Sequence, residues 1–505
     1  MKQLNDFIDF FAQKKPIYPF IIHGDYHLTF KDASSQIQSL TNKLINTGVR
    51  PGQTVGILLQ NCPEFIISYL AILNTGAIAV LLPWTVSKDE VATLATTTRI
   101  DTLIYSGHFQ EYADSICDLC GKPVKCFVLD GETDHNTESL RDSLNIRGVT
   151  KHQLATKDKN NAVILFSAGD YTHPKSIVFT HESLSETAAS SIERFPENYK
   201  FRLYTSLPYF HYFPFSVVIN LAIVSGSTII IPVDDSREAL YSSIHDHKVN
   251  TFIGNSGFIE ELTGDEHLKP EKLNSIDFYI PVGDSFSIKI KDLIYRRYGA
   301  IVMEAYGVAE APVISMNLNS NRNISLSVGK PLSCCEILIV DESGNEVDDG
   351  QPGNLMVRGK NVFHHYFDQY RGNGREPDEW IDTGDIARRD SEGFLYWEAK
   401  QSDRFYRNGF QVLPKSILDV VIQHPNIREA TILHSNYSKW HNEIQLAVTL
   451  FDDESPNKEE LLKFCKEKLP KYLVPDNIAV FDHFERNCIG VIQKSQLHQH
   501  EIVRK

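Results

Sequence analysis

Short apolar runs alternate with amphipathic stretches along the first 300 residues of the chain. Gln53–Leu59 and Ala77–Leu82 predict buried strands, and Pro63–Asn74 between them is predicted to form an amphipathic helix. Strand, helix and strand in this order form a crossover unit, which pairs the two strands in parallel. Further buried strands are predicted at Ala162–Phe166, Ser227–Pro232 and Phe278–Val282. Because the unit recurs, the pattern predicts a multilayered α/β domain.

The pattern changes after about residue 325. Glu336–Val340 and Asn354–Gly359 are short predicted strands, and Asp341–Asn345 between them is rich in turn-forming residues. This texture predicts a small β subdomain. Helix and strand patterns resume after residue 399, at Pro414–Gln423, Glu429–His434, Ile444–Leu450 and Lys458–Leu469. We therefore expect a domain boundary near residues 399–403, with a large domain at 1–398 and a small one at 399–505.

Length and charge narrow the classes of function. A chain of 505 residues is too long for one hydrophobic core, so two or more domains are expected. The 50 Lys and Arg residues against 65 Asp and Glu residues give a net charge of −15. This balance argues against nucleic acid or an anionic membrane as the main partner, and it still allows a local basic pocket.

No secretion or membrane signal stands out. Met1–Lys14 mixes charged residues with short apolar runs, and the longest apolar stretches, such as Phe215–Val224, fall short of the roughly 20 residues that a membrane span needs. Cys117-x-x-Cys120 with Cys126 could form half of a metal site, but no second pair has matching spacing. The other interpretation is free buried thiols in a cytosolic enzyme, and we expect a cytoplasmic protein without a membrane span.

A loop of small and hydroxyl residues follows the predicted strand 162–166. Ser167, Gly169 and Lys175 lie in this loop, which ends in Pro-Lys-Ser. Small residues let the main chain approach a phosphate closely, so that backbone N–H groups can surround it. The alternative is an ordinary surface turn.

Two later segments carry groups suited to a nucleotide. Glu304–Glu310 contains Tyr306 and Gly307 and ends on a carboxylate, the ligand that a hard cation such as Mg²⁺ requires. An alternative for this segment is a helix start with an exposed Glu310. Trp380–Asp385 ends in Thr-Gly-Asp, and a carboxylate in this position suits two ribose hydroxyls.

The order of these motifs resembles the AMP-forming acyl ligases, the superfamily of acyl-CoA synthetases, luciferases and peptide-synthetase adenylation domains. Thr-Gly-Asp at 383–385 is followed by Lys400, Asp403 and the loop Asn408–Pro414, as at the end of the large domain, the hinge and the first small-domain loop of that family. The resemblance implies an α/β fold. Its large N-terminal domain would comprise two α/β subdomains and a small β subdomain, below a smaller, mobile α+β C-terminal domain.

The resemblance also implies roles for individual residues. Tyr306 would stack on adenine, Glu310 would hold Mg²⁺, Asp385 would bind the ribose, and Lys400 stands over the ribose where the family usually has Arg. The residues implied to bind the nucleotide are Ser167, Gly169, Tyr306, Gly307, Asp385 and Lys400. Those implied to be catalytic are Lys175, His211 and Glu310, with Glu310 as the metal ligand.

His211 belongs to the segment Leu207–Phe213, which resembles a Pro-Leu-Phe-His segment of the family. The resemblance places His211 beside the acyl pocket, as a wall or gate. A histidine among aromatic residues can equally be a packed core residue. The neighbouring residues Tyr212, Phe213, Gly283 and Val308 would suit an apolar acyl or aryl group.

The chain differs from the family at positions that are expected to contact ATP. The lysine expected after Gly490 is Val491, the expected Thr is Ala309, and Tyr171 and Thr172 stand in the phosphate loop where a hydroxyl residue and glycines are usual. Loss of one preorganised donor to a developing charge typically costs about 3–4 kcal/mol, or ~10²–10³ in rate. We expect Val491 to impair adenylate formation while leaving acyl transfer from a supplied adenylate possible.

Two hypotheses follow. The first is an ATP- and Mg²⁺-dependent ligase that activates a carboxylic acid as acyl-AMP and transfers it to CoA, to the phosphopantetheine thiol of an acyl carrier protein, or to an amine. The second is a catalytically degenerate relative that binds a nucleotide, an acyl group or a partner protein.

Overall fold

The computed structural model describes most of the chain. The described residues are 3–134, 136–144, 161–167, 175–234, 236–265, 268–283, 288–317, 327–367, 378–407, 410–438, 441–451, 458–486, 492–494 and 497. No helix within these ranges is long and apolar enough to cross a membrane.

The first large sheet has the strand order β20-β9-β8-β4-β3-β5-β6-β7. The predicted crossover is confirmed, because β3 and β4 pair in parallel on either side of α3 (Pro63–Asn74). The strands are β3 (Thr54–Leu58), β4 (Ile78–Leu81), β5 (Thr102–Ser106), β6 (Lys125–Leu129), β7 (Thr137–Ser139), β8 (Asn161–Phe166), β9 (Ser176–Thr180) and β20 (His365–Tyr366). The last of these comes from far along the chain and pairs antiparallel with β9 at the sheet edge.

The second large sheet has the order β14-β13-β12-β10-β11-β1-β2. Its strands are β1 (Pro19–His23), β2 (Tyr26–Thr29), β10 (Arg202–Thr205), β11 (Thr228–Ile231), β12 (Thr251–Asn255), β13 (Phe278–Val282) and β14 (Ile301–Val302). Its core strands are apolar on both faces. On β11, Ile229 and Ile231 pack in the central core, whereas Ile230 packs in a separate cluster on the opposite face. This two-sided burial explains why the strand reads as a continuous apolar run.

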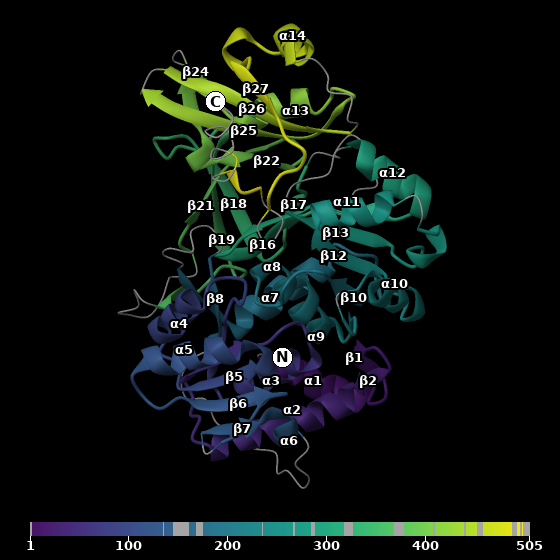
Figure 1. Ribbon diagram of the computed structural model, residues 1–505, viewed down its shortest axis with the longest axis vertical. Coiled ribbons are helices and arrows are strands. Elements are labelled where there is room, and N and C mark those ends of the chain that lie inside the picture. The colour runs from purple at the N-terminus through teal and green to yellow at the C-terminus, as the bar shows by residue number, and fades with distance from the viewer. Residues whose placement is uncertain are drawn as a thin grey trace.

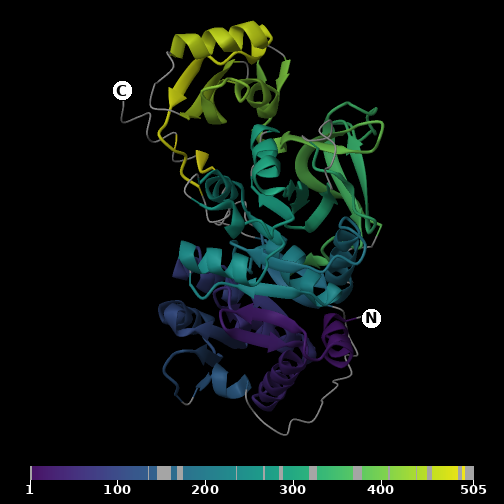
Figure 2. The ribbon, with the colours of Figure 1, turned by 90° about the vertical axis from the view of Figure 1, so that its right-hand side faces the viewer.

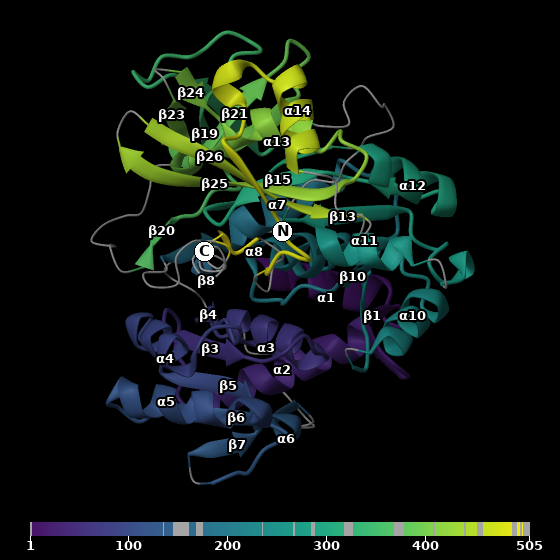
Figure 3. The ribbon, with the colours of Figure 1, turned by 45° about the horizontal axis from the view of Figure 1, so that its top comes forward.

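Helices cover both faces of each sheet. The central core holds residues of α1 (Leu4–Lys14), α2 (Phe30–Asn46), α3, α7 (His181–Ile192), the π-helix η2 (Phe215–Asn220) and α9 (Leu221–Ser225). The outer helices are α4 (Lys88–Thr97), α5 (Gln110–Cys120) and α6 (Leu140–Leu144) by the first sheet, and α10 (Arg237–Asp246), α11 (Ser256–Gly264) and α12 (Ile288–Tyr298) by the second. Figures 1 and 3 show α4 and α5 gathered on one side of the molecule and α10, α11 and α12 on the other.

Smaller sheets follow the two large ones along the chain. A three-stranded sheet has the order β15-β16-β17, and a four-stranded antiparallel sheet has the order β18-β19-β21-β22. Their strands are β15 (Ala305–Val308), β16 (Ala311–Met316), β17 (Lys330–Pro331), β18 (Cys335–Val340), β19 (Gly353–Gly359), β21 (Ile381–Arg389) and β22 (Leu395–Lys400). The predicted strands 336–340 and 354–359 are confirmed as β18 and β19.

The C-terminal part has its own core. Its elements are β23 (Phe405–Arg407), β24 (Phe410–Val412), α13 (Pro414–Val421), β25 (Ile427–Ser438), β26 (His441–Leu450), α14 (Lys458–Lys468) and β27 (Asn477–Val480). Side chains from these elements form a separate apolar cluster. Figures 1 and 2 place α14, in yellow, at the opposite end of the molecule from the purple N-terminal helices. β22 runs past the expected boundary to Lys400, and the division into domains 1–398 and 399–505 stays a prediction.

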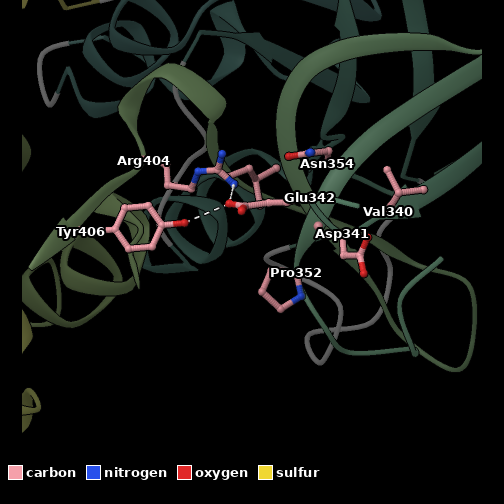
Figure 4. A pocket seen from close by; sticks show the side chains of 9 residues that line it. Val340, Asp341, Glu342, Pro352, Asn354, Arg404 and Tyr406 are labelled. Carbon is pink, nitrogen blue, oxygen red and sulfur yellow. Dashed lines mark hydrogen bonds and ion pairs between the residues drawn. The ribbon is translucent and has the colours of Figure 1, made fainter. Parts of the chain in front are cut away.

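A short 3₁₀ helix, Gln401–Asp403, connects the four-stranded sheet to the C-terminal part. Glu342, in the turn after β18, reaches across this junction: its Oε1 accepts a hydrogen bond from the Tyr406 hydroxyl (2.9 Å) and lies 3.1 Å from an Arg404 guanidinium nitrogen. These three residues line a cavity of about 270 Å³, shown in Figure 4. Lys494, near the C-terminus, pairs with Asp403 at 3.0 Å. Polar contacts thus link the four-stranded sheet to the C-terminal part at this junction.

Candidate active site

Asp385 lies on β21 with its carboxylate buried against Tyr306 of β15. The Tyr306 hydroxyl donates a 2.6 Å hydrogen bond to Asp385 Oδ2. Burial, followed by the negative charge of Asp385, raises the pKa of Tyr306 well above its usual value, so the phenol keeps its proton and remains a donor. Gly384 has a φ of +74°, a left-handed turn that glycine adopts without steric cost. The Thr-Gly-Asp sequence therefore turns the chain so that the carboxylate points inward.

The second oxygen of Asp385 lacks a hydrogen-bond donor. The residue is 2% exposed, and Oδ1 has no hydrogen-bond partner among the described residues. Lys400 Nζ lies 3.7 Å from Oδ1, beyond hydrogen-bond distance but close enough to balance its charge. A buried carboxylate oxygen left without a donor is costly, and a hydroxyl pair would satisfy it. The arrangement fits the ribose expected here, and it places Tyr306, Asp385 and Lys400 together.

Gly307 and Glu310 are set by the tight hairpin between β15 and β16. A Cβ on Gly307 would lie 2.2 Å from the Pro312 carbonyl oxygen, so no larger residue fits without opening the hairpin. Glu310 occupies the turn, and its carbonyl oxygen accepts a 2.8 Å hydrogen bond from the Phe363 backbone N–H. The alternative of a helix start with an exposed Glu310 is wrong: the segment is a hairpin, and the Glu310 side chain is 18% exposed.

Ser167 and Lys175 close the base of the predicted phosphate loop. The Ser167 N–H donates to the Lys175 carbonyl at 3.1 Å, and the Lys175 N–H donates to Ser167 Oγ at 3.0 Å. The first of these bonds continues the antiparallel pairing of β8 and β9 by one step, and the second adds a side-chain contact. The ends of the loop are thus held together, whereas Gly169 lies outside the described residues.

Lys175, Tyr366 and Glu310 form a polar cluster beside this loop. Tyr366 O–H donates to Glu310 Oε1 at 2.9 Å, and Lys175 Nζ donates to the Tyr366 oxygen at 3.4 Å. Lys175 Nζ also lies 3.8 Å from Glu310 Oε1. A cation and a carboxylate close together are the groups needed for a phosphate and its divalent metal. Sequence reasoning missed Tyr366, because a two-residue edge strand has no periodic signal.

His211 and Tyr212 adjoin the same hairpin. The Tyr212 hydroxyl donates to the Gly307 carbonyl at 3.4 Å, and the His211 and Tyr212 rings lie 4.3 Å apart. Burial lowers the pKa of His211 to about 3, so its imidazole is neutral at physiological pH. His211 Nδ1 accepts a hydrogen bond from the Phe213 N–H, and Nε2 has no partner among the described residues. A neutral donor beside aromatic rings suits an uncharged or apolar group.

The described residues contain no cluster of side chains that could hold a metal ion by themselves. Within the described ranges, no three His, Cys, Asp or Glu side chains are grouped to hold a metal ion. Cys117 and Cys126 lie with their sulfur atoms 4.0 Å apart, and Cys120 is also a free thiol. The role of Glu310 as a metal ligand stays a prediction.

Several sequence features lie outside the described residues. These are Gly169, Tyr171, Thr172, Gly409, Gly490 and Val491. Their proposed roles stay predictions. Lys494 pairs with Asp403 of the connecting 3₁₀ helix.

The chain is similar in sequence to known proteins. Residues 8–367 match the family model described as AMP-binding enzyme. The crotonobetaine/carnitine–CoA ligase of Salmonella arizonae is 24% identical over 484 residues, which cover 93% of each chain.

Solved structures agree with the fold. Anthranilate CoA ligase AuaEII in complex with anthranoyl-AMP has a TM-score of 0.87 at 19% identity, over 99% of this chain and 98% of that chain. O-succinylbenzoate coenzyme A synthetase (MenE) from Bacillus subtilis, in complex with ATP and a magnesium ion, has a TM-score of 0.81 at 24% identity, over 97% and 99%. The predicted α/β fold, with a large N-terminal and a small C-terminal domain, is confirmed.

Proposed function

Because the chain belongs to the AMP-binding enzyme family, we propose that it is an ATP-dependent ligase that activates a carboxylic acid as acyl-AMP. The acyl group would then pass to a thiol, with CoA as the first candidate because the relatives named above are CoA ligases. A carrier-protein phosphopantetheine and an amine are the other acceptors. The observation that carries the proposal is the buried Asp385 carboxylate, which has one oxygen held by Tyr306 and the other without a hydrogen-bond donor.

The reaction would run in two balanced steps. A carboxylate oxygen of the acid attacks the α-phosphorus of ATP, the bond to the β-phosphate breaks, and pyrophosphate leaves. In the second step a thiolate attacks the acyl carbon, and AMP leaves with the electron pair of the broken C–O bond. Both steps gain from fixed donors and cations at the places where charge develops.

The chain's residues supply binding and orientation. Asp385 would accept hydrogen bonds from the ribose hydroxyls, and Lys400 would balance its charge. Lys175 would neutralise phosphate oxygens, and Glu310 would hold the magnesium ion that accompanies the triphosphate. When bound, that ion supplies positive charge to the phosphates during attack.

His211 and Tyr212 would form a wall of the acid pocket. His211 is buried and uncharged, and Tyr212 keeps its proton because burial and the nearby carboxylates of Asp385 and Glu310 raise its pKa. Such an uncharged wall would not stabilise a second charged group on the acid. We therefore propose a monocarboxylic acid with an apolar or aromatic body.

The departures Ala309 and Val491 favour a second candidate, a relative that binds nucleotide or acyl groups with little adenylation. Exchange of labelled pyrophosphate into ATP, measured across a panel of carboxylic acids, tests the choice. Exchange above background that depends on the acid and is lost in Asp385→Ala supports the ligase. No exchange with any acid contradicts adenylation under these conditions.

Val491→Lys distinguishes a site that lacks only the lysine ammonium from a site that does not support adenylation. If adenylation is limited by the missing ammonium, this variant should raise the exchange rate by about 10²–10³. Val491→Met is the matched control, since it adds length without charge and should leave the rate near that of the parent. An unchanged rate in the Lys variant, together with no measurable ATP binding by the parent, would favour the second candidate.

A further inference from the structure

The Tyr366 hydroxyl lies between the two charged groups that the proposed function assigns to phosphate and metal. It is 2.9 Å from Glu310 Oε1 and 3.4 Å from Lys175 Nζ. The ammonium also lies 4.9 Å from the centre of the Tyr366 ring, within reach of a cation–π contact. One neutral side chain therefore contacts both the cation and the anion.

The direction of these hydrogen bonds is fixed by chemistry. A lysine ammonium can only donate, and an ionised carboxylate can only accept. The Tyr366 oxygen must therefore accept from Lys175, and its single proton must point to Glu310. Both the Tyr366 hydroxyl and the Lys175 ammonium contact Oε1 of Glu310, and neither bond uses Oε2, the oxygen that a metal would bind.

The fold holds Tyr366 in place independently of any ligand. Its backbone pairs with Ile177 on β9, two residues after Lys175. Its ring packs 4.6 Å from the ring of Phe363, whose N–H donates to the Glu310 carbonyl. Backbone pairing thus ties Tyr366 to the phosphate loop on one side and to the Glu310 turn on the other.

We propose that Tyr366 is a positioning residue for the metal–triphosphate group of the nucleotide. Its hydroxyl holds Oε1 of the Glu310 carboxylate and so leaves Oε2 to the metal. Without the hydroxyl, the Glu310 carboxylate loses this orientation, and Mg²⁺ must order the carboxylate in order to bind. The proposal rests on the proposed function, in which Glu310 meets the metal and Lys175 meets phosphate.

Calorimetric titration of ATP with magnesium, and of ATP with EDTA, tests this role in Tyr366→Phe. A hydrogen bond to a charged group is lost, so Mg²⁺·ATP should bind about tenfold more weakly, while metal-free ATP should bind as to the parent. Tyr396→Phe is the matched control, because it removes a hydroxyl that donates to Asp390 at 3.1 Å outside this cluster. Thermal unfolding of each variant monitors folding.

Glu310→Gln, alone and combined with Tyr366→Phe, distinguishes the role of Tyr366 from the metal-binding role of Glu310. If Tyr366 acts through Glu310, adding Tyr366→Phe to Glu310→Gln causes no further loss of Mg²⁺·ATP affinity. If Glu310→Gln weakens binding and Tyr366→Phe does not, the role of Tyr366 is overturned and the proposed function stands. If Glu310→Gln leaves the magnesium dependence unchanged, the metal assignment itself is overturned, and the role of Tyr366 with it. If Tyr366→Phe weakens ATP binding equally with and without magnesium, Tyr366 has only a structural role and the proposal is overturned.

Discussion

At the scale of single residues, three buried side chains of the site have protonation states that are fixed by their surroundings. Tyr306 and Tyr212 stay protonated because burial and nearby carboxylates raise their pKa values, and His211 stays neutral because burial lowers its pKa. Sequence motifs identified Tyr306, His211 and Asp385, because their residue types and order are distinctive. They could not show that the Tyr306 hydroxyl donates to Asp385, since that contact depends on two strands 79 residues apart.

His211 predicts a measurable effect of acid on stability. The unfolded chain takes up a proton on this residue near pH 6.5, whereas the folded chain resists protonation until about pH 3. The stability of the parent relative to His211→Gln should therefore be constant above pH 7 and fall as the pH drops through 6.5. At pH 5.5 the relative loss should be about 1.4 kcal/mol. Unfolding midpoints of both proteins at pH 7.5 and 5.5 measure it. An unchanged difference between the two proteins would contradict the burial of a neutral imidazole.

At the scale of elements, the apolar pattern located most of the regular structure. The helix predicted at 63–74 is α3, and the strand predicted at 278–282 is β13. These succeeded because buried helices and parallel strands carry long apolar runs. The expected amphipathic character of the helix is wrong, because every residue from Phe65 to Leu73 is buried. The pattern missed β20 and left the segment 304–310 open between a nucleotide site and a helix start, because a hairpin of short strands lacks a clear period. The site depends on these short elements, and for that reason Tyr366 emerged only from the structure.

Gly307 predicts how tightly the β15–β16 hairpin is built. In Gly307→Ala the new methyl meets the Pro312 carbonyl at 2.2 Å, so the hairpin must open and shift Tyr306 and Glu310. Stability should fall by about 1–3 kcal/mol, and ATP affinity should fall with it. Gly264→Ala at the end of α11 is the control, because no atom lies within 4 Å of its added Cβ. Denaturant midpoints and ATP titrations of both variants test this, and equal behaviour would contradict the close approach.

At the scale of the whole molecule, the large and small domains meet at the segment 401–406. The resemblance predicts that the small domain is mobile, so contacts at this junction should bias its orientation. Rotation of the small domain would break the contacts of Glu342, which binds both Arg404 and Tyr406 beyond the connecting helix (Figure 4). The length of the chain predicted more than one domain. It could not predict this contact, which joins a β-turn to a segment 62 residues later.

Glu342→Ala should shift the population of small-domain orientations. Glu342 is exposed and Arg404 partly buried. Ion pairs near the surface contribute about 0.2–1 kcal/mol, so the ratio of orientations should change about 1.4- to 5-fold. Single-molecule energy transfer between dyes on the two domains reports the populations. Glu336→Ala is the control, because Glu336 pairs with Arg358 within one sheet at similar exposure. If both variants give the parental distribution, Glu342 does not bias the domains.

The central claim is that Asp385 binds the sugar of an adenine nucleotide. Calorimetric titration of the parent and of Asp385→Asn with ATP and with 2′,3′-dideoxy-ATP tests it most directly. The account predicts that removing the sugar hydroxyls weakens binding at least tenfold in the parent and much less in the variant, because the two changes delete the same hydrogen bonds. Equal losses in both proteins, or parental affinity for the dideoxy nucleotide, would contradict it.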